Sequence, residues 1–137
     1  MNASAFALLG YAAWTLVLLG GIAVLRGRLI VAGQRAPNSF AVFGEDVSPF
    51  SARLCRAHAN CYENLPAFAA IVLLAIASGN AQITDPLALW ALAARIAQST
   101  VHLISTSNRA VQLRFALQFA QFLMQFWWIV QLFRVLM

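Results

Sequence analysis

Polar side chains on one short stretch of an otherwise apolar sequence are the first candidates for chemistry. Residues 53–66 read Arg-Leu-Cys-Arg-Ala-His-Ala-Asn-Cys-Tyr-Glu-Asn-Leu-Pro. If this stretch is helical, its two arginines, first asparagine and glutamate fall at i, i+3, i+7 and i+10, on one stripe roughly 80° wide. These four residues are Arg53, Arg56, Asn60 and Glu63. Charged groups are costly in lipid, and a stripe carrying two guanidinium groups can bind an anion.

A second polar stripe is expected further along the chain. Arg95, Gln98 and His102 are spaced at i, i+3 and i+7, so a helix would carry them on one face. A buried arginine needs an acidic partner, and Glu63 is the only acid on a predicted membrane helix. We therefore predict a Glu63–Arg95 ion pair, within one subunit or between two, that specifies how the helices pack.

Composition excludes an ordinary soluble domain. The chain has 137 residues, of which 62% are hydrophobic and 9% charged, and its mean hydropathy is +0.77. Its apolar runs are close to the ~20 residues that a membrane helix needs. We expect an all-α, integral membrane four-helix bundle that forms a single domain over residues 1–137, with helices at about 3–25, 51–78, 86–107 and 112–136. Glycines and prolines between residues 26 and 50 favour a loop long enough to fold over a site, and Ser51 can cap the second helix.

Charge placement predicts the orientation in the membrane. All nine basic residues are arginines, and they form neither a soluble basic face nor a nucleic-acid surface. Seven of them fall at or between helices one and two or three and four, which the positive-inside rule assigns to the cytoplasm, although Arg134 lies near the other end. We expect a multi-pass protein of a bacterial inner membrane with both termini periplasmic.

Several polar side chains have a simpler structural interpretation. Cys55 and Cys61 are six residues apart on the expected second helix, point in different directions and should stay reduced. No histidine or cysteine spacing matches a zinc site, so we expect no metal. Gln118, Gln121 and Gln125 lie on one side of the fourth helix, where we expect hydrogen bonds between helices.

The stretch Arg53-x-x-Arg56-Ala57-x-x-Asn60-Cys61-x-Glu63-x-x-Pro66 resembles the second-helix signature of the MAPEG family, the membrane-associated proteins in eicosanoid and glutathione metabolism. Gln112-Leu113-Arg114 is similar to the segment that carries the catalytic arginine in its cysteinyl-leukotriene synthase branch. The resemblance implies a homotrimer that binds glutathione as co-substrate between neighbouring subunits. A lipophilic second substrate would reach this site from the bilayer.

The same resemblance assigns roles to individual residues. It places Arg53, Arg56, Asn60 and Glu63 at glutathione-binding and structural positions, and Arg95 at the family's helix-three arginine. Gln98 and His102 would contact glutathione, and Arg114 would activate its thiol. Arg109 is the alternative, because the spacing from Arg95 to Arg114 is longer than in relatives. Ala59 stands where one branch has a further arginine, and His102 where tyrosine is commoner.

Glutathione chemistry suits these residues. Arginine forks bind carboxylates in a bidentate manner, and a guanidinium group near a helix amino terminus favours the thiolate that attacks. The predicted function is a glutathione transferase or peroxidase that acts on hydrophobic electrophiles or lipid hydroperoxides. The alternatives are a non-catalytic lipid-binding protein of this type and an accessory subunit of a membrane complex.

Overall fold

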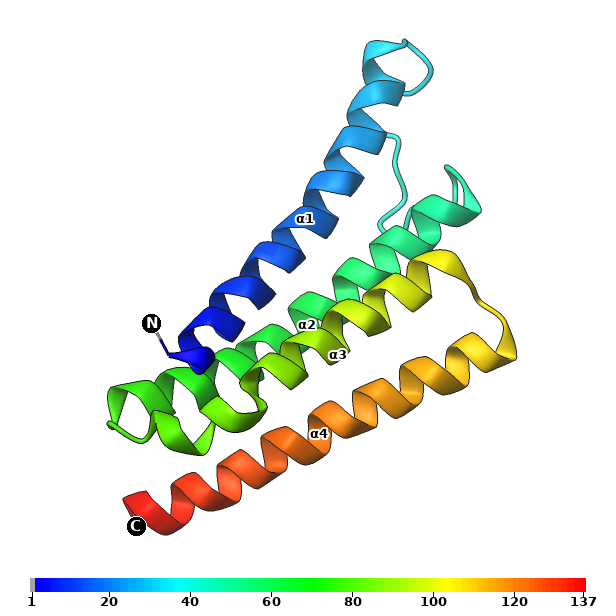
Figure 1. The fold of residues 1–137 in the computed structure, drawn as a ribbon. Coiled ribbons are helices and arrows are strands. Elements are labelled where there is room, and N and C mark those ends of the chain that lie inside the picture. The colour runs from blue at the N-terminus through cyan, green and yellow to red at the C-terminus, as the bar shows by residue number, and fades with distance from the viewer. Residues whose placement is uncertain (1) are drawn as a thin grey trace.

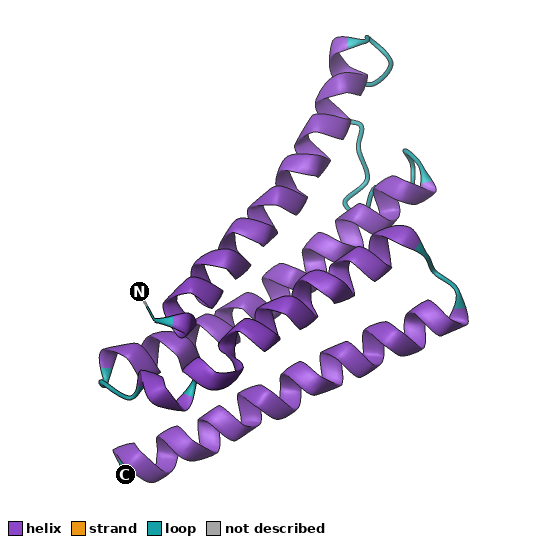
Figure 2. Cartoon of the chain, in the orientation of Figure 1, coloured by secondary structure: helices purple, strands orange, loops and turns teal. Residues whose placement is uncertain are grey.

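The protein is a four-helix membrane bundle. The computed structural model describes residues 2–137, and within that range it contains four α-helices, one short 3₁₀ turn and no strand (Figure 2). The helices are α1 (Ala3–Val31), α2 (Pro49–Ala77), α3 (Asp85–Ile104) and α4 (Asn108–Leu136), and the turn η1 is Ala81–Ile83. All four helices are long and apolar enough to cross a membrane. The predicted all-α membrane architecture is confirmed.

The helices are arranged around a central pair. α2 and α3 run side by side, with α1 packed on one side and α4 on the other (Figure 1). The two termini and the α2–α3 turn lie at one end of the bundle. The α1–α2 loop and the α3–α4 connection lie at the other end, where most of the arginines are found. We call this second end the arginine end.

α1 and α2 differ from the sequence prediction at the arginine end. α1 continues to Val31, six residues beyond the expected end at residue 25, because an arginine near the end of a membrane helix does not stop it. The helix stops where Gly33 adopts a φ of +69°, which glycine tolerates without a Cβ clash. α2 is capped by Ser48, whose side chain accepts a hydrogen bond from the backbone N–H of Ser51, so Ser51 is not the cap.

The third connection is shorter than predicted. α3 ends at Ile104, and α4 begins at Asn108 rather than near residue 112. Ser107 supplies the cap, since its side chain accepts a hydrogen bond from the backbone N–H of Ala110. Arg114 is consequently the seventh residue of α4, almost two turns from the amino terminus.

Aromatic packing fills the centre of the bundle. Tyr11, Phe68 and Trp128 are almost fully buried. The ring centroids are 5.1 Å apart for Tyr11 and Phe68 and 6.0 Å apart for Phe68 and Trp128, both with edge-to-face geometry. These contacts join α1, α2 and α4, and α2 stays continuous through Pro66, two residues before Phe68. Many large apolar side chains point outward instead, as expected for a surface in lipid.

At the end that carries the termini, α1 and α3 share one carboxylate. Asp85 Oδ1 accepts hydrogen bonds from the backbone N–H of Ser4 at 2.9 Å and from its hydroxyl at 2.6 Å. The Ser4 hydroxyl also lies 2.6 Å from the Thr84 hydroxyl. These bonds satisfy polar groups at the start of α1 and hold it against the start of α3.

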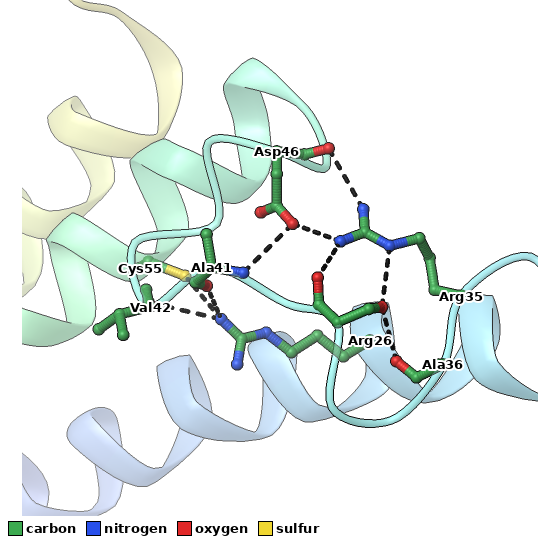
Figure 3. A network of polar contacts seen from close by, with 8 residues as sticks. Arg26, Arg35, Ala36, Ala41, Val42, Asp46 and Cys55 are labelled. Carbon is green, nitrogen blue, oxygen red and sulfur yellow. Dashed lines mark hydrogen bonds and ion pairs between the residues drawn. The ribbon is translucent and has the colours of Figure 1, made fainter.

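The α1–α2 loop, residues 32–48, is ordered by polar contacts within itself and with α1 (Figure 3). Arg35 forms an ion pair with Asp46, and this guanidinium group holds the pKa of the Asp46 carboxyl below its usual value. Arg26 donates a 2.9 Å hydrogen bond to the Ala41 carbonyl. Both guanidinium groups also lie over the Phe40 ring. The guanidinium carbon is 5.3 Å from the ring centroid for Arg26 and 4.9 Å for Arg35. The loop therefore has a defined path between α1 and α2.

Candidate functional site

The polar residues of α2 follow one face of the helix from its first turns toward the membrane interior. Arg53 is half-buried, and its Nε donates a 2.9 Å hydrogen bond to the Leu103 carbonyl. Arg56 and Glu63 are exposed. Asn60 lies between them, with its amide nitrogen 3.4 Å from His102 Nδ1. The predicted stripe is thus a continuous polar face, and its middle contacts α3.

The second predicted stripe turns inward from α3. Arg95 has no exposed surface, and Gln98 and His102 are each 6% exposed. On the same face, the Ser99 hydroxyl lies 3.3 Å from the Cys61 sulfur. α2 and α3 therefore bring their polar faces together. Both cysteines of the chain are free and buried, as predicted.

Arg95 makes no ion pair with any of residues 2–137. Its Nη1 donates to the Asn60 carbonyl at 3.2 Å and its Nη2 to Gln118 Oε1 at 3.1 Å. The guanidinium carbon lies 5.5 Å from the centroid of the Tyr11 ring. Neutral oxygens and an aromatic face thus take the positions expected for a carboxylate.

The predicted Glu63–Arg95 pair within one subunit is therefore wrong. Over residues 2–137, the ion pair in the α1–α2 loop is the only one that forms. Glu63 is exposed, while Arg95 is buried against other partners. A pair between two subunits stays a prediction.

A polar cavity of 410 Å³ opens at the arginine end. Arg53 and Arg56 from α2, His102 from α3 and Arg114 from α4 line it. Its remaining wall comes from Pro49, Ala52 and Thr106. Three guanidinium groups from two helices thus surround one space that can hold an anion.

A second cavity of 500 Å³ also borders Arg114. Its polar walls come from all three of the helices α2, α3 and α4, through Asn60, Glu63, Asn64, Gln98 and Gln118. Its apolar wall comes from α4, through Val111, Phe115 and Phe122. Because Arg114 lines both cavities, we treat them together as one groove and call it the α4 groove.

The sequence of α4 explains how this groove changes character along its length. Residues 111, 114, 115, 118 and 122 recur at helical spacing and share one face. On this face Val111 comes before Arg114, and the face ends with Phe122, so the groove passes from a charged end at Arg114 to an apolar end at Phe122. Arg109 is exposed and lines neither cavity, which distinguishes it from Arg114.

Of the three glutamines of α4 that were predicted to form hydrogen bonds between helices, Gln118 and Gln121 bond to α3. Gln98 Nε2 donates to Gln118 Oε1 at 3.1 Å, and Gln121 Nε2 donates to Gln98 Oε1 at 3.0 Å. Gln125 is also buried, but its amide nitrogen finds no acceptor among residues 2–137. The network joins α3 to α4 along the wall of the groove.

Sequence reasoning missed part of the groove. It assigned no site role to Asn64, Phe115 or Gln118, although the last two follow Arg114 by one and four residues on the same helix face. Asn64 Nδ2 and Arg114 Nε are buried and find no hydrogen-bond acceptor within residues 2–137. These donors are available to a polar ligand.

Comparison with known protein families gives a match over nearly the whole chain. The profile of the MAPEG family matches residues 4–134, which is nearly the whole chain and includes every residue of the α4 groove. No curated protein and no solved structure matches the chain. A match of this extent, on a chain with four membrane-spanning helices, shows that the protein is a multi-pass integral membrane protein that belongs to the MAPEG family.

Proposed function

We propose that the protein is a membrane-bound glutathione transferase, with glutathione peroxidase activity, that acts on hydrophobic electrophiles and lipid hydroperoxides. One observation carries this proposal: the α4 groove joins a cluster of three guanidinium groups to a phenylalanine-lined cavity, and Arg114 borders both. An anionic thiol and an apolar electrophile can therefore meet beside one cation.

The charged end of the groove suits glutathione. The tripeptide has two carboxylates, and guanidinium groups bind carboxylates through paired, charge-assisted hydrogen bonds. Arg53 and Arg56 bind these carboxylates. Neutral polar contacts come from Asn60, Gln98 and His102. Bound in this way, the tripeptide extends its cysteine toward Arg114.

Arg114 is the group that stabilises the thiolate. The influence of a helix dipole falls off within the first turn, and Arg114 is the seventh residue of α4. Its own positive charge, rather than the helix terminus, must therefore favour the ionised thiol. The attack on an electrophile then depends on positioning and on stabilisation of the charge that develops.

The two activities share this first step. In conjugation the sulfur forms a bond to the electrophilic carbon, and the leaving group departs with its electron pair. With a hydroperoxide the thiolate sulfur takes the distal oxygen, which gives an alcohol and a sulfenic acid. A second glutathione converts the sulfenic acid to the disulfide and water.

The assembly that we propose is a homotrimer in a bacterial inner membrane, with the arginine end in the cytoplasm and both termini periplasmic. Arg56 and Glu63 support assembly, since both are exposed on a membrane helix of the single chain and charged groups in lipid are costly. The clustering of arginines at one end supports the orientation.

Calorimetric titration of the detergent-purified protein with reduced glutathione tests the proposal. We expect saturable binding by the wild type, loss of binding in Arg56→Ala and retention in Arg134→Ala. Arg134 is also an exposed arginine and lies near the opposite end of the bundle, so it is the matched control. The same preparations are then assayed for conjugation of chlorodinitrobenzene and reduction of cumene hydroperoxide. Absence of binding by folded wild-type protein would refute the proposal and favour a lipid-binding or accessory role.

A further inference from the structure

The side-chain amide oxygen of Gln118 accepts two hydrogen bonds. Its Oε1 accepts hydrogen bonds from Arg95 Nη2 and from Gln98 Nε2, both at 3.1 Å. Both donors come from α3. Among residues 2–137, no hydrogen bond from Gln118 Nε2 is formed, and this side chain lines the groove. The amide therefore offers two N–H groups to the cavity.

The orientation of this amide is fixed by its neighbours. Arg95 has only donors, so the atom of Gln118 that faces it must be the oxygen. Gln98 is fixed as well, because Gln121 Nε2 donates to its Oε1 and thereby directs its own nitrogen toward Gln118. A flip of the Gln118 amide would set its nitrogen against two donors and lose both bonds.

The charge of Arg95 makes Gln118 a stronger donor. Arg95 has no exposed surface and no carboxylate partner within the described chain, so its field is weakly screened. A hydrogen bond from a cation to the amide oxygen draws electron density away from the amide nitrogen. The N–H groups of Gln118 are therefore polarised toward any negative oxygen in the groove.

The position of Gln118 indicates which part of a substrate it would meet. It follows Arg114 by one helical turn, about 6 Å along the same face. Phe115 and Phe122 line the same cavity. A thiolate beside Arg114 and an apolar chain along the phenylalanines would leave the oxygen of a short conjugated group near Gln118.

We propose that Gln118 is a specificity-determining donor that selects lipophilic α,β-unsaturated carbonyl compounds as the electrophiles of this enzyme. This inference rests on the proposed glutathione transferase function and names the substrate class of the same site. The thiolate sulfur forms a bond to the β-carbon, and the π electrons shift onto the carbonyl oxygen. Gln118 donates a hydrogen bond to the resulting enolate oxygen. Water then protonates the α-carbon and replaces the proton that the thiol lost on ionisation, so the net product is a thioether.

The experiment compares two electrophiles in the detergent-purified protein. The first is a long-chain conjugated ketone, whose transition state places charge on an oxygen. The second is benzyl chloride, which loses chloride and develops no such oxyanion. Gln118→Leu removes the donor, and Gln112→Leu is the matched control on an exposed position of α4 outside the groove. Thermal unfolding of each variant in detergent reports on folding.

We expect Gln118→Leu to lower the ratio of kcat/KM for the ketone to kcat/KM for benzyl chloride by on the order of tenfold to a hundredfold, as for loss of a hydrogen bond to a charged oxygen. Gln112→Leu should leave the ratio unchanged. An unchanged ratio in a folded Gln118→Leu protein would overturn the inference. If kcat/KM fell equally for both electrophiles, the role of Gln118 would be structural. Wild-type protein that conjugates neither electrophile would instead refute the proposed function itself.

If Gln118→Leu fails to fold, Gln118→Glu separates the two roles. The glutamate retains an acceptor for Arg95 and Gln98 but turns a second acceptor, rather than a donor, toward the groove. The ratio should fall by on the order of tenfold or more relative to the wild type, because the donor to the enolate oxygen is lost. A folded Gln118→Glu protein with the wild-type ratio would overturn the inference.

Discussion

The proposed role of Arg114 leads to a quantitative prediction. A free thiol has a pKa of about 8.5, so about 3% of it is ionised at pH 7. A unit charge about 4 Å away is worth about 4 kcal/mol at an effective dielectric constant of about 20. Because the groove is open and Arg114 is half-buried, we take about half of that energy. About 2 kcal/mol corresponds to about 1.5 pKa units and brings the bound thiol close to pH 7.

Arg114→Ala should therefore reduce the thiolate fraction at pH 7 about fifteenfold and lower kcat/KM for conjugation to a similar extent. The loss should shrink as pH rises, because above about pH 9 the thiol ionises without assistance. The ultraviolet thiolate band of bound glutathione, titrated from pH 6 to pH 10, measures the shift directly. Glutathione binding at high pH checks that the site remains formed.

Arg109→Ala is the control for this experiment, since Arg109 lies on the same helix but lines neither cavity. It should retain the wild-type pH profile. An inactive Arg109→Ala together with an active Arg114→Ala would refute the assignment. So would a loss in Arg114→Ala that stays constant from pH 6 to pH 10, because a change in thiol ionisation must depend on pH.

Three further predictions concern stability. Arg95→Ala should destabilise the fold by about 2–5 kcal/mol in thermal unfolding, because it leaves a cavity and buried acceptors without donors. Glu63→Ala should leave the unfolding of a single subunit near that of the wild type, because Glu63 forms no ion pair within residues 2–137. The pKa of Asp46 is lowered, so its ion pair with Arg35 stabilises the loop above the unfolded pKa of about 3.9, and this stabilisation is lost as pH falls through the lower folded value. The protection factors of amides 40–46, which correct each exchange rate for its intrinsic pH dependence, should thus be constant from pH 5 to pH 8 and fall below that pKa, and they should be reduced at all pH values in Asp46→Asn. Gly44→Ala should cost more than the ~1 kcal/mol expected of Gly33→Ala, since both glycines have a φ of +69° but only a Cβ at residue 44 would clash with the side chain of Ser51 in α2. Equal melting temperatures for the two variants would contradict this.

The fold could be predicted because lipid imposes simple requirements. Every backbone polar group in the membrane must be satisfied, so four apolar runs of sufficient length become four helices. Helix ends were less predictable, since they depend on single residues. Gly33 and the caps Ser48 and Ser107 set them, and the flanking arginines do not. This is why α1 extends beyond Arg26 and Arg28.

The spacing of the candidate site residues predicted which helix face is buried, but it did not predict their hydrogen-bond partners. The periodicity of Arg95, Gln98 and His102 correctly predicted one buried face. The prediction that Glu63 is the partner of Arg95 within one subunit was wrong because it treated a carboxylate as the only group able to stabilise a guanidinium group. A backbone carbonyl from α2 and an amide oxygen from α4 fill that role, and only the packed helices bring them together. The environment of Gln118 depends on the same packing.

The balance of charge in the α4 groove connects these observations. Three guanidinium groups, from Arg53, Arg56 and Arg114, face one carboxylate, from Glu63, so the side chains that line the groove carry a net charge of +2 with His102 neutral. Glutathione has two carboxylates and one ammonium group, so it brings a charge of −1 as the thiol and −2 as the thiolate. Ionisation of the thiol thus completes the neutralisation of the groove. The buried charge of Arg95, which no acid within the described chain offsets, acts in the same direction. The groove as a whole, and not Arg114 alone, therefore favours the nucleophilic form of the ligand.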